Sequence, residues 1–399
     1  MHSFDDELNL RLAGLREQGL FRELRRVDSA QGPCIKIGGK IFLNFSSNDY
    51  LGLANHPALK EAAIKAVEKF GAGAGASRLV CGSLAPFHEL EESLAAFKKT
   101  EASLTFSTGY AAAMGTITAL VGKDDVIVLD KLVHASIVDA AKLSEAKLRI
   151  FDHNDLDDLE KILTWADKLR TENGKNKKNI LIVTESIFSM DGDAAPLREI
   201  AGLKDKYGAW LMVDEAHATG LYGKNHRGLA EALDISDRIE IQMGTLGKAI
   251  GASGGYICGS RVLMDFLVNR ARNFIFSTAP VPAAAAAAKA GIELLQSPEG
   301  ERRCQDAWNL AKLLEHSTGS AGIYMAAPDS LIMPLIIGSE DKAVAISSAL
   351  RESAIFVPAI RFPTVSRGSA RLRITLTAAH SPNDVGTLVN ALSSAIKPA

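Results

Sequence analysis

The chain has 399 residues, of which 47% are hydrophobic and 23% are charged, and its formal net charge is −2. This balance is typical of a globular protein with more than one lobe, and it gives no electrostatic reason to expect nucleic acid or an anionic membrane as a partner. The 4 cysteines form no C-x-x-C pair, the N-terminus has no apolar signal-peptide core, and no apolar run reaches membrane-spanning length, so we expect a cytoplasmic protein without a zinc site.

The N-terminal quarter of the chain contains three predicted elements and one glycine-rich stretch. Leucines and charges recur at helical spacing over Asp6–Arg26, which predicts an exposed amphipathic helix. A short strand at Lys40–Asn44 and a helix over His56–Phe70, beginning at Pro57, follow. The stretch at residues 71–77 formally matches G-x-G-x-x-A, but it follows a helix where a dinucleotide fingerprint requires a strand, so we exclude a dinucleotide site.

From about residue 100, apolar strand-like runs alternate with helical or loop segments. This alternation predicts an α/β fold with a mainly parallel sheet covered by helices. The predicted strands are Val126–Asp130, Ile180–Thr184, Ala209–Asp214, Ile239–Met243 and Gly255–Cys258.

A smaller lobe is expected at the C-terminal end of the chain. An alanine-rich helix, Ala283–Gln296, leads away from the sheet, and strand-like segments follow at Leu331–Ile337 and Arg371–Leu376. We therefore expect an N-terminal helical arm with a short strand (1–50), a large cofactor-binding domain (51–289) and a small C-terminal α+β domain (290–399).

Polar residues follow four of the predicted strands. Because ligands bind at the carboxyl ends of strands in open α/β sheets, four such clusters predict one shared site. In strand order the residues are His134, then Ser186 and Ser189, then Asp214 and His217, then Thr245 and Lys248.

Each of the strongest candidates also has an ordinary structural interpretation. Lys248 stands in a loop of small residues, where a buried lysine loses proton affinity and can react with a carbonyl group; a solvated surface lysine is the alternative. Asp214 ends an apolar strand and would need a cation such as a protonated pyridine nitrogen, unless it is a helix N-cap or a metal ligand. His217 could face the same ligand or be a core histidine.

Two further segments suggest anion binding. Gly109 and Tyr110 begin a predicted helix whose N–H groups could hold a phosphate, although an ordinary capped helix has the same pattern. Near the end of the chain, Arg361, Arg371 and Arg373 are suited to carboxylate recognition. Arg371 and Arg373 point the same way on a strand, and the alternative for at least one of these arginines is surface charge on an edge strand.

Taken together, these motifs resemble the α-oxoamine synthase family of pyridoxal phosphate enzymes. The resemblance extends from Leu43–Gly52 to Leu372–His380 and includes Val183–Gly192, Val213–Gly220 and Thr245–Lys248. It implies a fold-type I enzyme that uses pyridoxal 5'-phosphate, without a metal, to condense an amino acid with an acyl thioester and release carbon dioxide. Within the family, Asn44–Tyr50 and Ala359–Val365 most resemble the members of the biotin pathway, and this resemblance implies L-alanine and a pimeloyl thioester, on coenzyme A or a carrier protein, as substrates.

The resemblance assigns four residues to the cofactor ring and to catalysis. Lys248 would hold the cofactor covalently, and Asp214 would pair with the pyridine nitrogen. His134 would stack on the ring. His217 would hydrogen-bond the phenolic oxygen, with Ser189 nearby.

The resemblance also indicates which residues would bind the cofactor phosphate and the substrate. Arg373 would take the substrate carboxylate with help from Asn48 of a partner subunit, so a homodimer with a shared site is implied. Arg361 could contact a distal carboxylate, and Arg371 stays an alternative to Arg373. The phosphate would be held by Gly109, Tyr110, Thr245 and, from the partner subunit, Ser277 or Thr278; for the acyl chain, three N-terminal arginines compete, namely Arg22, Arg25 and Arg26.

Several other functions remain open from the sequence. Within the same family, glycine with an acetyl thioester or serine with a long-chain acyl thioester would use the same cofactor residues. An aminotransferase on the same fold would need a 2-oxo acid and no thioester. A scaffold without catalysis is disfavoured because Lys248 and Asp214 are both present.

Overall fold

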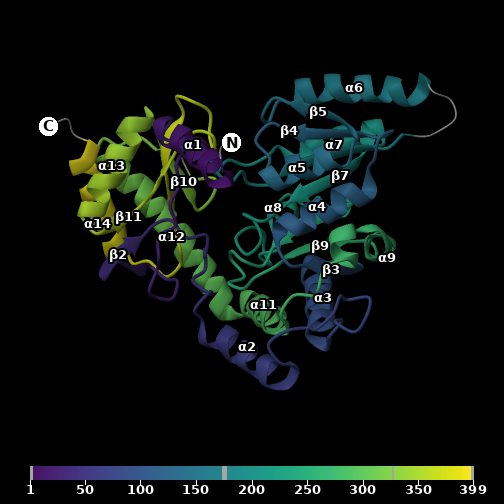
Figure 1. The fold of residues 1–399 in the computed structure, drawn as a ribbon, viewed down its shortest axis with the longest axis horizontal. Coiled ribbons are helices and arrows are strands. Elements are labelled where there is room, and N and C mark those ends of the chain that lie inside the picture. The colour runs from purple at the N-terminus through teal and green to yellow at the C-terminus, as the bar shows by residue number, and fades with distance from the viewer. Residues whose placement is uncertain (1–2, 173–177, 326–327, 397–399) are drawn as a thin grey trace.

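The computed structural model describes residues 3–172, 178–325 and 328–396, and within them a seven-stranded sheet forms the core of the larger lobe (Figure 1). The strand order is β3-β9-β8-β7-β6-β4-β5. Strands β5, β4, β6, β7 and β8 pair in parallel, whereas β9 is antiparallel to both β8 and β3. The bounds are β3 (Ala102–Phe106), β4 (Val126–Asp130), β5 (Lys147–Phe151), β6 (Ile180–Glu185), β7 (Trp210–Asp214), β8 (Ile241–Thr245) and β9 (Gly255–Gly259).

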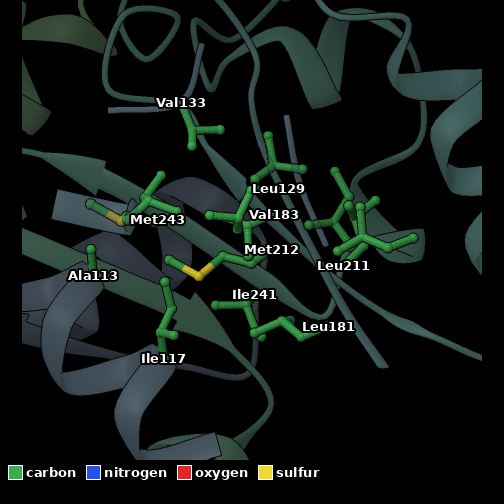
Figure 2. Close-up of a cluster of buried hydrophobic side chains, with 14 of the residues drawn as sticks. Ala113, Ile117, Leu129, Val133, Leu181, Val183, Leu211, Met212, Ile241 and Met243 are labelled. Carbon is green, nitrogen blue, oxygen red and sulfur yellow. The ribbon is translucent and has the colours of Figure 1, made fainter. Parts of the chain in front are cut away.

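Continuous apolar runs form the central strands because helices cover both faces of this sheet. Every residue of β4 and of β6 is buried, as expected for strands without a solvent-facing side. Figure 2 shows part of this core, where Ala113 and Ile117 of a covering helix lie among the strand side chains Met212 and Ile241. The helices of this lobe are α3 (Ala85–Lys98), α4 (Gly109–Leu120), α5 (Ala135–Leu143), α6 (Leu156–Glu172), α7 (Leu197–Tyr207), α8 (Leu229–Ala232), η1 (Ser236–Arg238), α9 (Arg261–Arg270) and α10 (Arg272–Ile275).

Two small sheets form the second lobe. One has the order β1-β2-β11 and the other β10-β13-β12. Because β2 pairs with β11, residues near 40 and near 355 lie side by side, so the N-terminal strand packs with the C-terminal lobe. The bounds are β1 (Cys34–Ile37), β2 (Lys40–Asn44), β10 (Ile332–Gly338), β11 (Ile355–Phe356), β12 (Ala359–Ile360), β13 (Ala370–Thr375), α12 (Pro298–Ser320), α13 (Glu340–Glu352) and α14 (Pro382–Ile396).

Helices α2 (Pro57–Phe70) and α11 (Pro282–Leu295) pack on one another, and α12 runs from α11 into the second lobe (Figure 1). We retain the division into residues 1–50, 51–289 and 290–399 as a proposal. Of the described helices, none is long and apolar enough to cross a membrane.

The first helix is shorter than the sequence pattern predicts. Helix α1 spans Phe4–Glu17 and has no buried residue, so its predicted exposure is confirmed, but the prediction that it continues to Arg26 is wrong. Gly19 follows with a φ of +66°, a left-handed conformation that favours glycine and ends a helix. The leucine spacing beyond this point, over residues 20–26, therefore belongs to a segment without helix or strand.

Candidate active site

Three of the four predicted polar clusters converge on one cavity of about 170 Å³ at the carboxyl ends of the parallel strands. The fourth cluster, Ser186 and Ser189, does not line it, and Glu185 at the end of β6 does. Residues from the ends of β6, β7 and β8 meet residues from the start of α4 and from the loop before α5. The cavity is lined by Gly109, Tyr110, His134, Ser136, Glu185, Asp214, Ala216, His217, Met243, Thr245 and Lys248.

Lys248 enters the cavity from the loop after β8. Its Nζ lies 2.8 Å from Nε2 of His217. Burial lowers the pKa of Lys248 to about 8, although the carboxylates of Asp214 and Glu185 oppose the shift. About a tenth to a fifth of this amine is therefore neutral near physiological pH, far more than for an ordinary lysine, and the neutral form is the one that reacts with a carbonyl group.

His217 is held between Lys248 and Tyr50. The Tyr50 hydroxyl is 2.5 Å from Nδ1 of His217, and only 1% of Tyr50 is exposed. Burial, aided by the charges of Lys248 and Arg373, lowers the pKa of His217 well below its usual value, so the ring is neutral. A neutral imidazole has one donor and one acceptor nitrogen, and its two neighbours decide which is which.

Asp214 and Glu185 occupy neighbouring register positions at the ends of β7 and β6. Asp214 is 5% exposed, and its Oδ1 accepts a hydrogen bond of 2.8 Å from the Ala216 N–H. Burial raises the pKa of Asp214, against the charges of Lys248 and His134. Burial and then repulsion from Asp214 raise the pKa of Glu185 well above its usual value. A cation beside Asp214 would offset its desolvation.

His134 caps the N-terminus of α5, and both its backbone and its ring are held by hydrogen bonds. Its backbone N–H donates to Oε1 of Glu185 at 2.5 Å, and its Nδ1 lies 2.8 Å from Oγ of Ser136. Burial lowers the pKa of His134, so the ring is predominantly neutral. Glu185 was not among the residues predicted from sequence, although it ends an apolar strand just as Asp214 does, and that shared pattern could have identified it.

The N-terminus of α4 faces the same cavity. The Thr108 hydroxyl accepts from the Ala111 N–H, which leaves the N–H groups of Gly109 and Tyr110 at the cavity. A Cβ at Gly109 would approach Cβ of Thr245 to 3.6 Å, so the helix start and the end of β8 lie close together. This arrangement suits a phosphate group.

Arg373 and Arg371 lie on β13, the middle strand of its sheet, so the alternative of surface charge on an edge strand is wrong for both. Arg373 donates to the Ser189 carbonyl at 2.6 Å and to Oδ1 of Asn48 at 3.1 Å. Asn48 therefore reaches Arg373 within one chain, where the sequence prediction placed it in a partner subunit. Arg371 is bound by the Asp191 carboxylate.

Other predicted site residues lie away from the cavity in the single chain. Ser277 and Thr278 line a separate small pocket beside Arg78. The Ser189 side chain is not among the groups that line the cavity, and its carbonyl contributes instead by accepting from Arg373. Arg361 lies beside Gly19, just after the end of α1. Of the three N-terminal arginines, Arg25 lies over the ring of Phe356 at 5.8 Å, and no contact with the cavity is seen for Arg22 or Arg26 among the described residues.

The residues present fit pyridoxal 5'-phosphate. A buried carboxylate for the pyridine nitrogen, an amine of lowered pKa for the aldehyde and a helix N-terminus for the phosphate all border one cavity.

A model of the aminotransferase class I and II family matches residues 40–392. The chain belongs to this family. Two similar curated relatives, from Geobacter sulfurreducens and Anaeromyxobacter dehalogenans, are both named 8-amino-7-oxononanoate synthase. The first is 45% identical over 96% of this chain and 96% of the relative, and the second is 46% identical over 98% of this chain and 96% of the relative.

Solved structures of family members agree with the fold. Serine palmitoyltransferase from S. paucimobilis with bound PLP–myriocin matches with a TM-score of 0.89 at 29% identity, covering 98% of this chain and 96% of that one. The 8-amino-7-oxononanoate synthase of Francisella tularensis matches with a TM-score of 0.74 at 27% identity, covering 88% and 97%. The predicted fold-type I architecture and the resemblance to α-oxoamine synthases are thereby confirmed.

Proposed function

We propose that this family member is a pyridoxal phosphate-dependent acyltransferase that condenses L-alanine with a pimeloyl thioester to form 8-amino-7-oxononanoate and carbon dioxide. The observation that carries the proposal is the convergence of Lys248, Asp214, His217 and His134 on one cavity, in a chain 44% to 48% identical to proteins named for that product. The solved serine palmitoyltransferases are 28% to 30% identical to this chain.

When bound, pyridoxal phosphate withdraws electrons from the α-carbon of the amino acid. Asp214 would hold a proton on the pyridine nitrogen, because a buried carboxylate is stabilised by a cation. His134 would position the ring. Lys248 would hold the cofactor aldehyde, and its neutral Nζ would serve as the base for the α-proton of the amino acid; His217, 2.8 Å away, orients that amine.

Arg373 is the group we assign to the amino acid carboxylate. It is buried and does not itself line the cavity, but its charge acts on His217 and Lys248, and its guanidinium is already oriented by Asn48 and the Ser189 carbonyl. Arg371 is an unsuitable alternative because the Asp191 carboxylate occupies it. A contact of Arg361 with a distal carboxylate stays a prediction.

A homodimer is the assembly we propose. In the single chain, Ser277 and Thr278 lie outside the cavity, so a phosphate contact from either residue requires a second subunit. Large apolar side chains beside them are exposed, including Phe276 and Val281. A groove of about 680 Å³ next to Phe276 adds surface that a second chain would cover. A cytoplasmic location also stays a prediction.

The proposal is tested by thiol release from purified protein supplied with pyridoxal phosphate, across a grid of amino acids and acyl thioesters. We expect release to peak with L-alanine and pimeloyl thioester and to vanish in Lys248→Ala. A peak with glycine and acetyl thioester, or with serine and a long-chain thioester, would overturn the substrate assignment. Amino-group transfer to a 2-oxo acid without thiol release would overturn the reaction itself.

A further inference from the structure

A charged cluster outside the cavity lining joins three segments that are far apart in sequence. His153 follows β5, Asp130 ends β4, and Asp193 lies in the loop after β6. Nδ1 of His153 is 3.0 Å from Oδ1 of Asp130, and Nε2 is 2.8 Å from Oδ2 of Asp193. A carboxylate only accepts hydrogen bonds, so both ring nitrogens must carry a proton to make both bonds.

The charges around His153 favour the imidazolium form. Burial alone would lower the pKa of His153, but the hydrogen bonds to Asp130 and Asp193 outweigh it and raise the pKa to about 10. Lys131 and Asp152, the sequence neighbours of Asp130 and His153, form their own exposed ion pair at 2.9 Å. The cluster is therefore positively charged at its centre and negatively charged on both sides at neutral pH.

Asp130 connects this cluster to the segment that carries His134. Its carboxylate also accepts from the N–H groups of Leu132, at 2.8 Å, and Asn154, at 3.0 Å. The chain from Asp130 to His134 is thus fixed at its first turn by the same carboxylate that holds His153.

Asp193 connects the cluster to the loop that orients Arg373. The Phe188 N–H donates to the Asp193 carbonyl at 3.0 Å, and the ring of His153 packs edge-on against Phe188 with centroids 4.4 Å apart. The next residue, Ser189, accepts the 2.6 Å hydrogen bond from Arg373.

The loop that contains Phe188–Asp193 also packs against the second lobe. Arg371 binds Asp191, and a Cβ at Gly192 would lie 2.2 Å from the Ile332 carbonyl oxygen, so no larger residue fits there without movement. The loop is consequently held from one side by β10 and β13 and from the other side by His153.

We propose that His153 is a positioning residue. Through its hydrogen bonds to Asp130 and Asp193 it holds the loop of Phe188–Asp193 in a defined position relative to His134, and this loop in turn orients the guanidinium of Arg373. The proposal rests on the proposed function, because it takes Arg373 as the group that binds the amino acid carboxylate. His153 itself lines no part of the cavity, so its effect is exerted through the loop.

The first test compares His153→Gln with His226→Gln. His226 is a matched control because it is buried and bonded to a carboxylate, Glu301, at 2.8 Å, yet lies outside the cavity lining. We expect His153→Gln to raise both the KM for L-alanine and its dissociation constant, read from the cofactor absorbance, by about tenfold, which is the loss of one charged hydrogen bond. The KM for the thioester and both constants of His226→Gln should change less than about twofold.

Equal changes in the two variants, or a change confined to the thioester KM, would overturn the proposal. Failure of wild-type protein to release thiol would contradict the proposed function instead, and it leaves the L-alanine dissociation constants as the test of His153.

The second test uses Asp193→Asn, which keeps the side-chain shape and removes one carboxylate. The nitrogen chemical shifts of selectively labelled His153 should show protonation up to about pH 10 in the wild type and a lower pKa in the variant. The ratio of variant to wild-type dissociation constants for L-alanine should then rise between about pH 7 and pH 9, as the variant imidazolium loses its proton. An unshifted His153 pKa, or a ratio that does not vary with pH, would overturn the proposal.

Discussion

At the scale of single residues, burial dominates the chemistry of the cavity. Lys248, His217 and Tyr50 form one hydrogen-bonded row, and burial is the largest cause of the shift for each of them. Burial raises the pKa of Tyr50 to about 12, so its hydroxyl stays protonated. At neutral pH the row therefore contains a neutral His217 and a protonated Tyr50 hydroxyl beside a Lys248 amine that is partly neutral.

Replacement of Tyr50 with Phe should lower kcat by about tenfold, because Nδ1 of His217 loses its partner in a buried site. Tyr324→Phe is the matched control, since Tyr324 is 89% exposed. Steady-state kinetics with L-alanine and pimeloyl thioester provide the measurement. An unchanged kcat in Tyr50→Phe would show that His217 does not depend on this hydroxyl.

The pKa of Lys248 makes cofactor attachment pH-dependent. Only the neutral amine reacts, and the folded-state pKa is about 8, so the rate of pyridoxal phosphate incorporation by cofactor-free protein should rise through about pH 8 and then level off. Stopped-flow absorbance checks this, with a lysine peptide as the reference. A midpoint near that of the peptide would contradict the lowered pKa.

At the scale of elements, a buried ion pair fixes the segment that carries Asp214 and His217. Nζ of Lys98, at the end of α3, binds the Glu215 carboxylate, and the side chains of both are almost fully buried. Glu215 also accepts from the Ala230 N–H at 2.9 Å, which ties α8 to the end of β7.

Lys98→Met should lower the free energy of unfolding by about 3–5 kcal/mol, because it leaves a buried carboxylate without its partner. Lys65→Met is the control, since Lys65 and its partner Glu61 are exposed and the change should not be measurable. Chemical denaturation of both variants gives the comparison. A loss no larger than that of Lys65→Met would contradict the structural role of the pair.

The sequence predicted best the helices and strands whose apolar pattern and end signals both lie within a short stretch of chain. The bounds of β2, β4 and the proline-started α2 match the structure because their apolar runs and end signals lie within a few residues. Strands β3 and β5 were not predicted. Strand β5 lies at the sheet edge with a mixed burial pattern, so it lacks the continuous apolar run of its neighbours.

The sequence predicted only those site residues that lie at or just after the ends of strands. His134, Asp214, His217 and Lys248 each follow a strand, and the rule that ligands bind at strand ends brings them together. Tyr50 and His153 were not predicted from the sequence, because their contacts join residues more than 20 positions apart and no local pattern encodes such contacts. The sequence did not show which of Arg371 and Arg373 is available for a substrate carboxylate, because that depends on the position of Asp191, which binds Arg371.

At the scale of the whole molecule, the single chain leaves apolar surface uncovered beside Ser277 and Thr278, which we propose contact the phosphate in a partner subunit. Phe276 is 71% exposed and precedes Ser277 and Thr278. We expect the protein to sediment as a dimer and Phe276→Asp to weaken both the dimer and the affinity for pyridoxal phosphate. Analytical ultracentrifugation with a parallel cofactor titration measures both. A fully active monomer would contradict the shared site.

The most direct test of the condensation is its stoichiometry. L-alanine labelled at the carboxyl carbon is incubated with pimeloyl thioester and the cofactor-loaded protein, and labelled carbon dioxide, free thiol and 8-amino-7-oxononanoate are counted. We predict equal amounts of all three, and none from Lys248→Ala. Thiol without carbon dioxide, or consumption of L-alanine with neither, would contradict a decarboxylative condensation at this site.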